Sequence, residues 1–499
     1  MRILNSGAGV PATISAVMLS LALTATSVRA QDVPLAQLLP DLILREITLK
    51  SPPTSGLPGV PDGFTHEAHF SPLEANELNN PVVGIVQGFN AQMAMQFSTF
   101  PLGSSTGGMT YVFDESLGTF RRGSASFGPL FAERALTIGR RKLSAGFNYQ
   151  RTSYNTLEGQ ELDDGSIKFY LRHQDCCTIA AGVLTNQPNG TRLNPPFEGD
   201  VIEAALRLKA TTHTTAMLAD FGVTDRWDIG LVVPFVRVNL DAAATARVLR
   251  LVTDQPVLSS FLSPEELQAA RNTHTFEQNN PSATRTVRSS GHASGLGDIV
   301  LRTKYHFLRT AGGGLAAAVD LRLPTGDEKE LLGTGGVEAK FLLIASSEHS
   351  RFGEHVNFGY TTAEGDVAGR IGGFTSTQLP DEINYSGGIE FVGNPRFTLM
   401  GDVVGRTLRR VGRLDVVSKS FLYRQFDQTG ATLPATMPAS VSFDEFAARP
   451  GNLTLLLGTG GVKFNPVGNL LISGSVVFPL TDAGLRSRVT TVIGMDYAF

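Results

Sequence analysis

The feature that most constrains this chain is a two-residue alternation of apolar and polar side chains, which recurs in segments of about ten residues. In the last segment, 489–499, one parity is mostly apolar or aromatic, and the other carries charged and small residues. The same alternation appears at 143–150, 202–209, 299–307, 315–323 and 337–343. Because successive side chains of a β-strand point to opposite faces, the pattern predicts many strands with one apolar and one polar face.

Two kinds of protein use such strands, namely soluble sandwiches and membrane barrels. No stretch after residue 30 approaches 18 uninterrupted apolar residues, so the sequence predicts no transmembrane helix. The strands are numerous and follow one another as hairpins. A membrane-spanning chain must satisfy its backbone groups within helices or a closed sheet, and consecutive two-faced hairpins favour the closed sheet.

The alternation places about 14 strands, with a range of 12 to 16. They lie at 142–155, 199–210, 213–222, 227–238, 240–251, 297–308, 313–323, 335–346, 353–361, 383–392, 397–407, 452–463, 469–478 and 488–499. With this assignment the long connections fall on one side and the short turns on the other, as a membrane barrel requires. Only the connection 222–226 is short on the long-loop side. We therefore predict an all-β fold, a transmembrane antiparallel β-barrel.

Residues 1–30 have the features of a signal peptide. Arg2 supplies an early positive charge, residues 14–23 form a short apolar core, and Ala30 precedes the expected cleavage. Together with the barrel pattern, this predicts a protein of the bacterial outer membrane. The strand parity puts the N- and C-termini on the periplasmic side.

Charge and cysteine content exclude several classes. The chain has 42 basic and 46 acidic residues and no basic block, so a nucleic-acid partner is not expected. The two cysteines, Cys176 and Cys177, are adjacent and do not form a disulfide framework. Their role is left open, and no second Cys/His cluster indicates a metal site.

Charged residues on the polar parity are expected to face a wet lumen, because a charge facing lipid at mid-membrane costs roughly 2–4 kcal/mol. These candidate pore-lining residues are Glu203, Arg207, Lys209, Arg302, Lys304, His306, Asp320, Arg322, Glu338, Lys340, Glu390, Asp402, Arg406, Arg488 and Asp496. Two interpretations remain open for each of them. It either stabilises the wall through cross-strand pairs or lies along a solute path.

Residues 31–133 do not follow the barrel rhythm, and the barrel proper is expected over 134–499. Residues 79–99 favour a helix, and 108–122 favour a hairpin. A barrel of this size is too wide for its wall side chains to fill. The N-terminal segment is therefore expected either to plug the lumen or to extend into the periplasm.

The sequence carries no recognisable catalytic constellation. The Gly-rich stretches at 295–298 and 333–336 lack the remaining elements of a nucleotide site, and no Ser stands in a nucleophile elbow. The histidines are scattered without metal-ligand spacing. We therefore expect neither an enzyme nor a bound cofactor or metal.

Several turn-rich motifs resemble a family of outer-membrane β-barrel proteins described as transporters and linked to the meta pathway of phenol degradation. The matching stretches lie at 126–139, 221–228, 233–234, 295–298, 323–335 and 357–360. The resemblance implies uptake of a small solute, with hydrophobic or aromatic compounds as candidates. The long-chain fatty-acid transporters, with 14 strands and an N-terminal plug, are a looser analogy of fold alone.

The sequence therefore predicts a passive outer-membrane channel or transporter for small solutes. The alternative is a structural or adhesive barrel that binds a partner through its long outer loops. Expected partners are outer-membrane lipid, the barrel-assembly machinery and a small-molecule solute, and the oligomeric state is left open. Tyr497 and the terminal Phe499 resemble the signal read by that machinery, and both fit an aromatic girdle.

Overall fold

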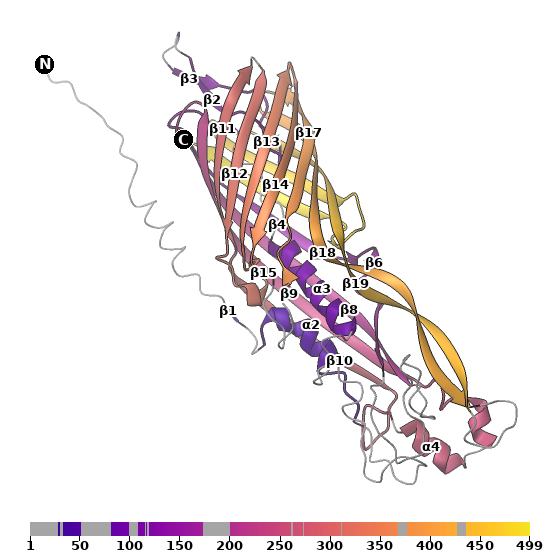
Figure 1. Ribbon diagram of the computed structural model, residues 1–499. Helices are drawn as coiled ribbons and strands as arrows, with labels where there is room; N and C mark the ends of the chain where they lie inside the picture. The colour runs from indigo at the N-terminus through magenta and orange to yellow at the C-terminus, as the bar shows by residue number, and fades with distance from the viewer. Residues whose placement is uncertain are drawn as a thin grey trace.

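The computed structural model describes residues 28–29, 33–50, 81–98, 108–114, 116, 119–172, 200–260, 263–272, 274–310, 312–367, 377–426 and 436–499. Within these residues, 12 strands pair in an antiparallel cycle and close into a barrel (Figure 1). The cycle closes where β8 pairs with β9. This confirms the predicted fold class, with a strand count at the lower end of the expected range.

The barrel strands are β4 (Leu143–Tyr154), β8 (Val201–Gly222), β9 (Trp227–Leu249), β11 (Ile299–Thr310), β12 (Gly313–Leu323), β13 (Val337–His349), β14 (Phe352–Glu364), β17 (Glu382–Asn394), β18 (Phe397–Phe426), β19 (Thr436–Phe464), β20 (Leu470–Pro479) and β22 (Thr490–Ala498). Two further strands pair with this sheet, β7 (Ile167–Arg172) with β8 and β10 (Thr284–Leu296) with β9. The two-residue strand β1 (Val28–Arg29) pairs with β10 and falls within the predicted signal peptide. The rest of that peptide, and Cys176 and Cys177, lie outside the described residues.

The remaining elements are helices and short strands. They are α2 (Leu35–Leu44), α3 (Pro81–Ser98), β2 (Tyr111–Asp114), β3 (Thr119–Arg122), β5 (Thr156–Leu157), β6 (Gln160–Glu161), η2 (Pro256–Ser260), α4 (Pro264–Asn272), η3 (Glu328–Glu330), β15 (Asp366–Val367), β16 (Thr377–Gln378) and β21 (Leu485–Arg486). The helix expected at 79–99 and the hairpin expected at 108–122 are confirmed by α3 and by the β2–β3 pair. None of the described helices is long and apolar enough to cross a membrane.

The count of 14 was too high because β8 and β9 are each one continuous strand. Their register runs without interruption from Val201 opposite Leu249 to Gly222 opposite Asp228. The turns implied between the predicted strands 199–210 and 213–222, and between 227–238 and 240–251, are therefore wrong. At the first of these positions the Thr-rich stretch 211–215 stays extended, as its β propensity allows. Without these two turns, β8 and β9 are consecutive strands, and the connection 222–226 lies at the same end of the barrel as the other short turns. Long and short connections then alternate without exception.

These two strands are longer than a membrane needs. At about 3.3 Å per residue, the 22 residues of β8 reach about 70 Å, whereas the hydrocarbon core is about 30 Å thick. The molecule accordingly has two parts. One is the closed half, which carries all the short turns and the C-terminus (Figure 1). The other is the extension, formed by β7, β10, 201–209 of β8, 235–249 of β9 and the β18–β19 ribbon at 411–451.

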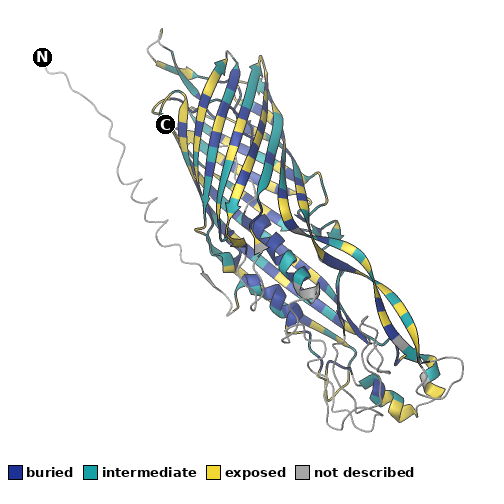
Figure 2. Ribbon diagram, viewed as in Figure 1, coloured by how far each residue is buried: buried dark blue, intermediate teal, exposed yellow. Residues whose placement is uncertain are grey.

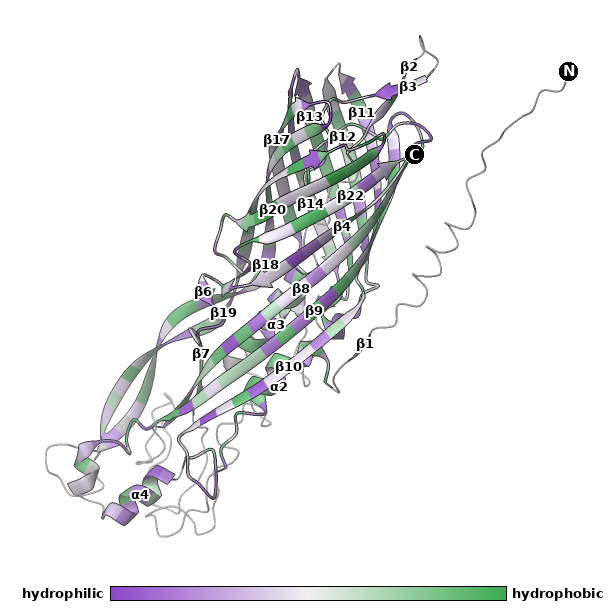
Figure 3. Ribbon diagram, turned by 180° about the vertical axis from the view of Figure 1, so that it is seen from behind, coloured by the Kyte–Doolittle hydropathy of each residue, from purple (hydrophilic) through white to green (hydrophobic). Residues whose placement is uncertain are grey.

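The two parts have opposite polarity. In the closed half large apolar side chains cover the outer face, among them Phe341, Leu343 and Phe358, which are 51%, 53% and 60% exposed. In the extension the apolar side chains of β8 and β9 point inward and are buried (Figures 2 and 3). The outer band of the closed half fits lipid, since 11-residue strands such as β12 match the membrane thickness.

The helices α2 and α3 lie against the inner face of the extension, and most of their residues are buried (Figure 2). Leu39 and Phe89 of these helices belong to one apolar cluster with Leu208, Leu240 and the β18–β19 ribbon. Near the first residues of β8 the ribbon contacts the sheet again, where Tyr170 of β7 and Phe443 of β19 stack with ring centroids 4.4 Å apart. Most of the apolar core therefore lies in the extension and not in the closed half.

Candidate functional site

A segment of irregular chain crosses the interior of the closed half near its short-turn end. We call residues 123–139 the plug segment. Its polar groups contact inward-facing side chains of β9, β11, β13, β14, β17, β18 and β19. Because these strands surround the lumen, the plug segment lies inside the barrel and not beside it. The segment also crosses the predicted boundary at 133, since β4 begins only at Leu143.

Carboxylates and an amide of the barrel wall accept hydrogen bonds from backbone N–H groups of the plug segment. Asp402 accepts from Leu130 and Phe131, at 3.1 and 3.3 Å. Asp228 accepts from Ile138 at 2.9 Å. Asn357 accepts from the Glu133 N–H and donates to the Glu133 carbonyl, at 2.7 and 2.8 Å. Buried backbone groups need such partners, and here the wall supplies them in place of a regular ladder.

Two lysines of the barrel wall donate hydrogen bonds to carbonyl groups of the plug segment. Lys463 donates to the carbonyls of Phe127 and Pro129, at 3.2 and 2.7 Å. Lys304 donates to the carbonyl of Arg134 at 3.3 Å. Both lysines are almost fully buried, so each ammonium is stabilised by a fixed set of oxygen acceptors.

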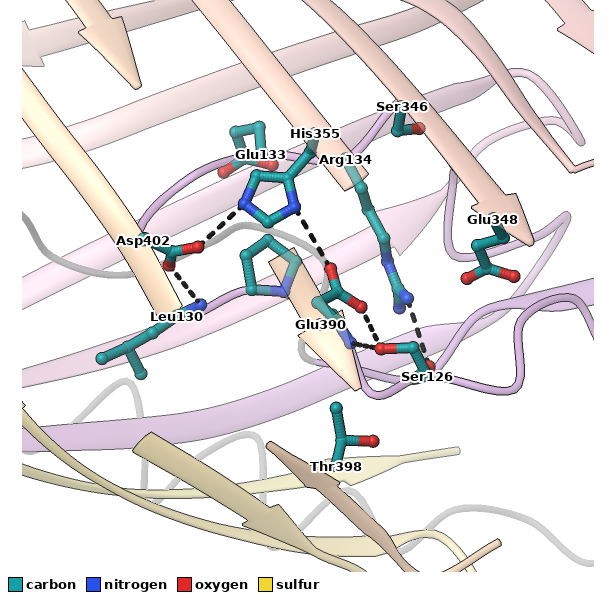
Figure 4. Close-up of polar contacts among 12 residues, drawn as sticks. Ser126, Leu130, Glu133, Arg134, Ser346, Glu348, His355, Glu390, Thr398 and Asp402 are labelled. Carbon is teal, nitrogen blue, oxygen red and sulfur yellow. Dashed lines mark hydrogen bonds and ion pairs between the residues drawn. The ribbon is translucent and has the colours of Figure 1, made fainter. Parts of the chain in front are cut away.

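A histidine joins two of the carboxylates that hold the plug segment. His355 Nε2 lies 2.8 Å from Asp402 Oδ1, and its Nδ1 lies 3.4 Å from Glu390 Oε1 (Figure 4). Ser126 of the plug segment donates its hydroxyl to the same Glu390. The side chain of His355 is fully buried. This chain of contacts, from Ser126 to Leu130 through the wall, closes a ring around the middle of the segment.

Glu133 of the plug segment joins a second network. Arg302 makes a two-fold contact with Asp320, at 2.5 and 2.6 Å, and reaches Glu133 at 2.6 Å. Lys304 lies 3.7 Å from the same Glu133. Planar two-fold contacts of this kind are the strongest ion pairs in proteins and fix orientation as well as charge. The plug segment is therefore fixed at both its backbone and its side chains.

A cavity of about 160 Å³ lies between the plug segment and α3. Phe131 and Glu133 line it from one side, and Gln96 lines it from the other. The wall contributes both charged and apolar side chains, including Arg302, Arg406 and Leu342. The lumen is thus filled at two levels, and the space left between them is small and amphipathic.

Most of the charged residues singled out from the sequence lie on the inward face of the closed half. These are Arg302, Lys304, His306, Asp320, Arg322, Glu338, Lys340, Glu390, Asp402, Arg406 and Asp496. Six of them line the cavity on its wall side, namely Arg302, Asp320, Arg322, Glu338, Lys340 and Arg406. Lys304, Glu390 and Asp402 hold the plug segment instead.

The structure places four of the predicted pore-lining residues elsewhere. Glu203, Arg207 and Lys209 lie on the outer face of the extension, and Glu203 pairs there with Lys168 and Arg247, at 3.3 Å each. Their expected inward orientation is wrong because, beyond the membrane, the polar face of β8 meets water outside. Arg488 is also misplaced, since it precedes β22, is 69% exposed and pairs with Glu161 at 2.6 Å.

Sequence reasoning missed several residues that organise the lumen. His355, Asn357 and Lys463 occupy inward positions of predicted strands, so a full parity assignment would have found them. Glu133 and Arg134 lie in irregular chain, where no periodicity exists to indicate their orientation. Tyr497 and Phe499 project outward at the short-turn end, with ring centroids 4.8 Å apart, and their role in barrel insertion stays a prediction.

Comparison with known proteins supports the family indicated by the motifs. The family described as "Putative MetA-pathway of phenol degradation" matches residues 185–407, which confirms the resemblance inferred from the sequence. No curated protein matches the chain significantly. The matched residues include β8 to β17 and the first part of β18.

Solved structures of two channels and a transporter align along most of the chain. An outer membrane channel from Pseudomonas putida F1 has 10% identity and a TM-score of 0.39, over 73% of this chain and 98% of that one. The CymD monoaromatic hydrocarbon channel has 10% identity and a TM-score of 0.30, over 72% and 89%. The Ralstonia pickettii toluene transporter TbuX has 11% identity and a TM-score of 0.24, over 73% and 91%.

Proposed function

We propose that the protein is a passive outer-membrane channel for small solutes, with hydrophobic and aromatic compounds among them. The observation that carries the proposal is the closed half. Its outer face is apolar, and its inner face holds charged side chains around a cavity. A structural barrel has no need for space between two internal segments, whereas a channel needs a site where a solute can pause.

The proposed orientation puts the short turns and both ends of the barrel in the periplasm, and the extension outside the cell. Long connections on the outer side and short turns on the inner side are the usual arrangement of bacterial barrels. Tyr497 and Phe499 would then lie at the periplasmic interface, where aromatic side chains gather and where the assembly machinery would read the C-terminal strand.

In this orientation the plug segment forms the last barrier before the periplasm. A solute that enters from the extension reaches the cavity after passing α3, and then meets the plug segment. Since wall residues on seven strands hold that segment, passage requires either a route around its edge or local release of some of these contacts. The rate of passage is thus expected to depend on the strength of the plug contacts.

Purified full-length chain in planar bilayers and in liposomes tests the proposal. We expect small, discrete conductance events, and liposome swelling that is faster with small aromatic solutes than with sugars of similar size. The matched control is the same preparation after heat unfolding. Absence of both conductance and solute flux, from protein shown to be folded by its heat-shifted electrophoretic mobility, would refute transport.

A further inference from the structure

The cavity between the plug segment and α3 has the size of a one-ring compound. Its volume is about 160 Å³, and an engineered protein cavity of about 150 Å³ holds one benzene molecule. Drug-sized ligands occupy pockets of about 300 Å³ or more, so larger solutes exceed the space available here.

Part of the cavity lining is suited to a ring. Phe131 of the plug segment, Leu342 of β13 and Leu455 of β19 contribute apolar surface, and Val404 and Leu457 extend it. An aromatic ring buried against such side chains gains roughly 25 cal/mol for each Å² removed from water. This part of the lining offers no hydrogen bonds, so it selects for shape and not for polar substituents.

The charged part of the lining has one cation more than it has carboxylates. Three arginines pair with the four acids: Arg302 with Glu133 and Asp320, Arg322 with Glu338 at 3.3 Å, and Arg406 with Glu382 at 3.2 Å. Lys340 stands opposite Asp320 in the sheet register. Arg486 is the fifth cation and takes no part in these pairs.

Arg486 lies in β21, in the connection between β20 and β22, and only 4% of its surface is exposed. Its Nη2 donates to Thr481 Oγ1 at 2.9 Å, and within the described residues its Nε has no hydrogen-bond partner. Burial, aided by the neighbouring Arg406, lowers the pKa of Arg486 to about 10, although nearby Glu158 opposes the change. A buried guanidinium with an unfilled donor is stabilised by an anion placed against it.

We infer that this cavity binds a one-ring aromatic carboxylate, with the ring against Phe131 and Leu342 and the carboxylate on Arg486. The inference rests on the proposed function and names its substrate class. The two halves of such a ligand match the two halves of the lining, whereas a neutral ring would leave the Arg486 donor unfilled. An inorganic anion would leave the apolar surface uncovered.

Titration calorimetry on the full-length protein in detergent tests this inference, with sodium benzoate as the probe. Benzyl alcohol and sodium acetate serve as the neutral and the ringless comparisons. The variant is Arg486→Gln, and its control is Arg488→Gln, two residues away, which removes an exposed guanidinium. Arg486→Lys retains the charge, and Phe131→Ala removes ring contact. We expect Arg486→Gln to weaken benzoate binding about tenfold or more, since it removes the charged hydrogen-bond donor that faces the carboxylate.

Under the inference, Arg488→Gln leaves benzoate binding unchanged, Arg486→Lys recovers part of it, and Phe131→Ala weakens benzyl alcohol as well as benzoate. Equal benzoate binding by wild type and Arg486→Gln would overturn the inference, as would acetate binding as tightly as benzoate. Conductance is measured on the same preparations. Conducting wild-type protein without benzoate binding defeats the inference and leaves the proposed channel intact, whereas benzoate binding without conductance or flux defeats the channel.

Discussion

The closed half and the extension use the same alternation of side chains with opposite results. Along β8, even-numbered residues point inward in both parts. In the closed half these include the buried Asp220, whereas the outward Phe221 is 40% exposed. In the extension the inward residues include the buried Leu206 and Leu208, and the outward ones include Lys209. The geometry of the strand does not change, but its surroundings do, since lipid lies outside one part and two apolar helices lie inside the other.

Alternation alone therefore identifies an apolar and a polar face of a strand, but it does not determine which of them points into the barrel. The apolar face points outward where a lipid bilayer surrounds the barrel, and it points inward where it packs against a buried pair of helices. In a strand long enough to leave the membrane, the inward positions therefore change from polar to apolar within one element. The predictions below test where this reversal lies and what depends on it.

The largest effect is expected from two adjacent alanines in the extension. Ala244 is 1% exposed and faces α2 and α3, and Ala243 lies on the outer face. Ala244→Asp places an unpaired charge in the apolar cluster and is expected to cost about 3–5 kcal/mol. Ala243→Asp is expected to stay within about 0.5 kcal/mol of wild type. Urea unfolding in detergent, followed by heat-shifted mobility, measures both.

If Ala243→Asp proved as damaging as Ala244→Asp, the outer face of the extension would have to be covered by lipid or by another chain. A harmless Ala244→Asp would mean that α2 and α3 do not pack there. Either result removes the contrast between the two parts of β9, although their register with β8 would stand.

The second effect concerns the outer face of the closed half. Leu343 lies at the middle of β13 and is 53% exposed. Leu343→Arg is expected to cost about 2–4 kcal/mol, as charges at the midplane do in membrane barrels. The matched control, Ser290→Arg, adds the same charge to the outer face of the extension, opposite Asp241, and should be nearly neutral. Folding yield into lipid vesicles measures the difference, and equal yields would contradict a lipid-facing closed half.

The reversal also explains which parts of the fold were predictable. Strands confined to the closed half, such as β12 and β13, were placed within a few residues, because their polar face meets the lumen as assumed. β8 and β9 were each cut in two, and Arg207 and Lys209 were turned inward, because both steps assumed a strand that ends with the membrane. The length of a strand outside the bilayer depends on tertiary packing, and no local period records it.

A third effect is expected inside the closed half, where polar contacts hold the plug segment. Asp402→Asn removes the charge that accepts from Leu130 and Phe131 and that faces His355. Weakening these contacts by about 1–3 kcal/mol should release the middle of the segment. Channel open probability in planar bilayers should then rise by about tenfold for each 1.4 kcal/mol lost. Glu354→Gln, on the outer face of β14, is the matched control.

An unchanged open probability in Asp402→Asn, with folding intact, would show that this contact is not part of the barrier. The plug contacts also mark the limit of sequence reasoning about the site. Asp402 and Glu390 were identified as inward residues from parity, but their partners Leu130 and Ser126 lie in chain without a period. Only the assembled barrel brings these positions together, because residues 123–139 and 390–402 are far apart in sequence.

The smallest effect is expected at the junction of the two parts. Glu158 lies in the β5–β6 turn, 3.7 Å from Arg413 of the ribbon, and its side chain is 8% exposed. Burial raises the pKa of this carboxyl above its ordinary value, although a backbone contact with Gly484 and the charge of Arg413 oppose the change. The folded state then favours the neutral form, so the contribution of Glu158 to stability is greatest at low pH and declines as pH rises through the raised pKa.

Glu158→Gln should therefore raise the melting temperature by about 1–2 °C at pH 7 and leave it unchanged near pH 4. Circular dichroism melts in detergent across this range measure the difference, with Glu161→Gln in the neighbouring strand as the control. A lower melting temperature at pH 7 would mean that the ion pair with Arg413 outweighs the burial of the charge. In that case the junction behaves like the lumen of the closed half, where paired charges stabilise the wall, and not like the apolar interior of the extension.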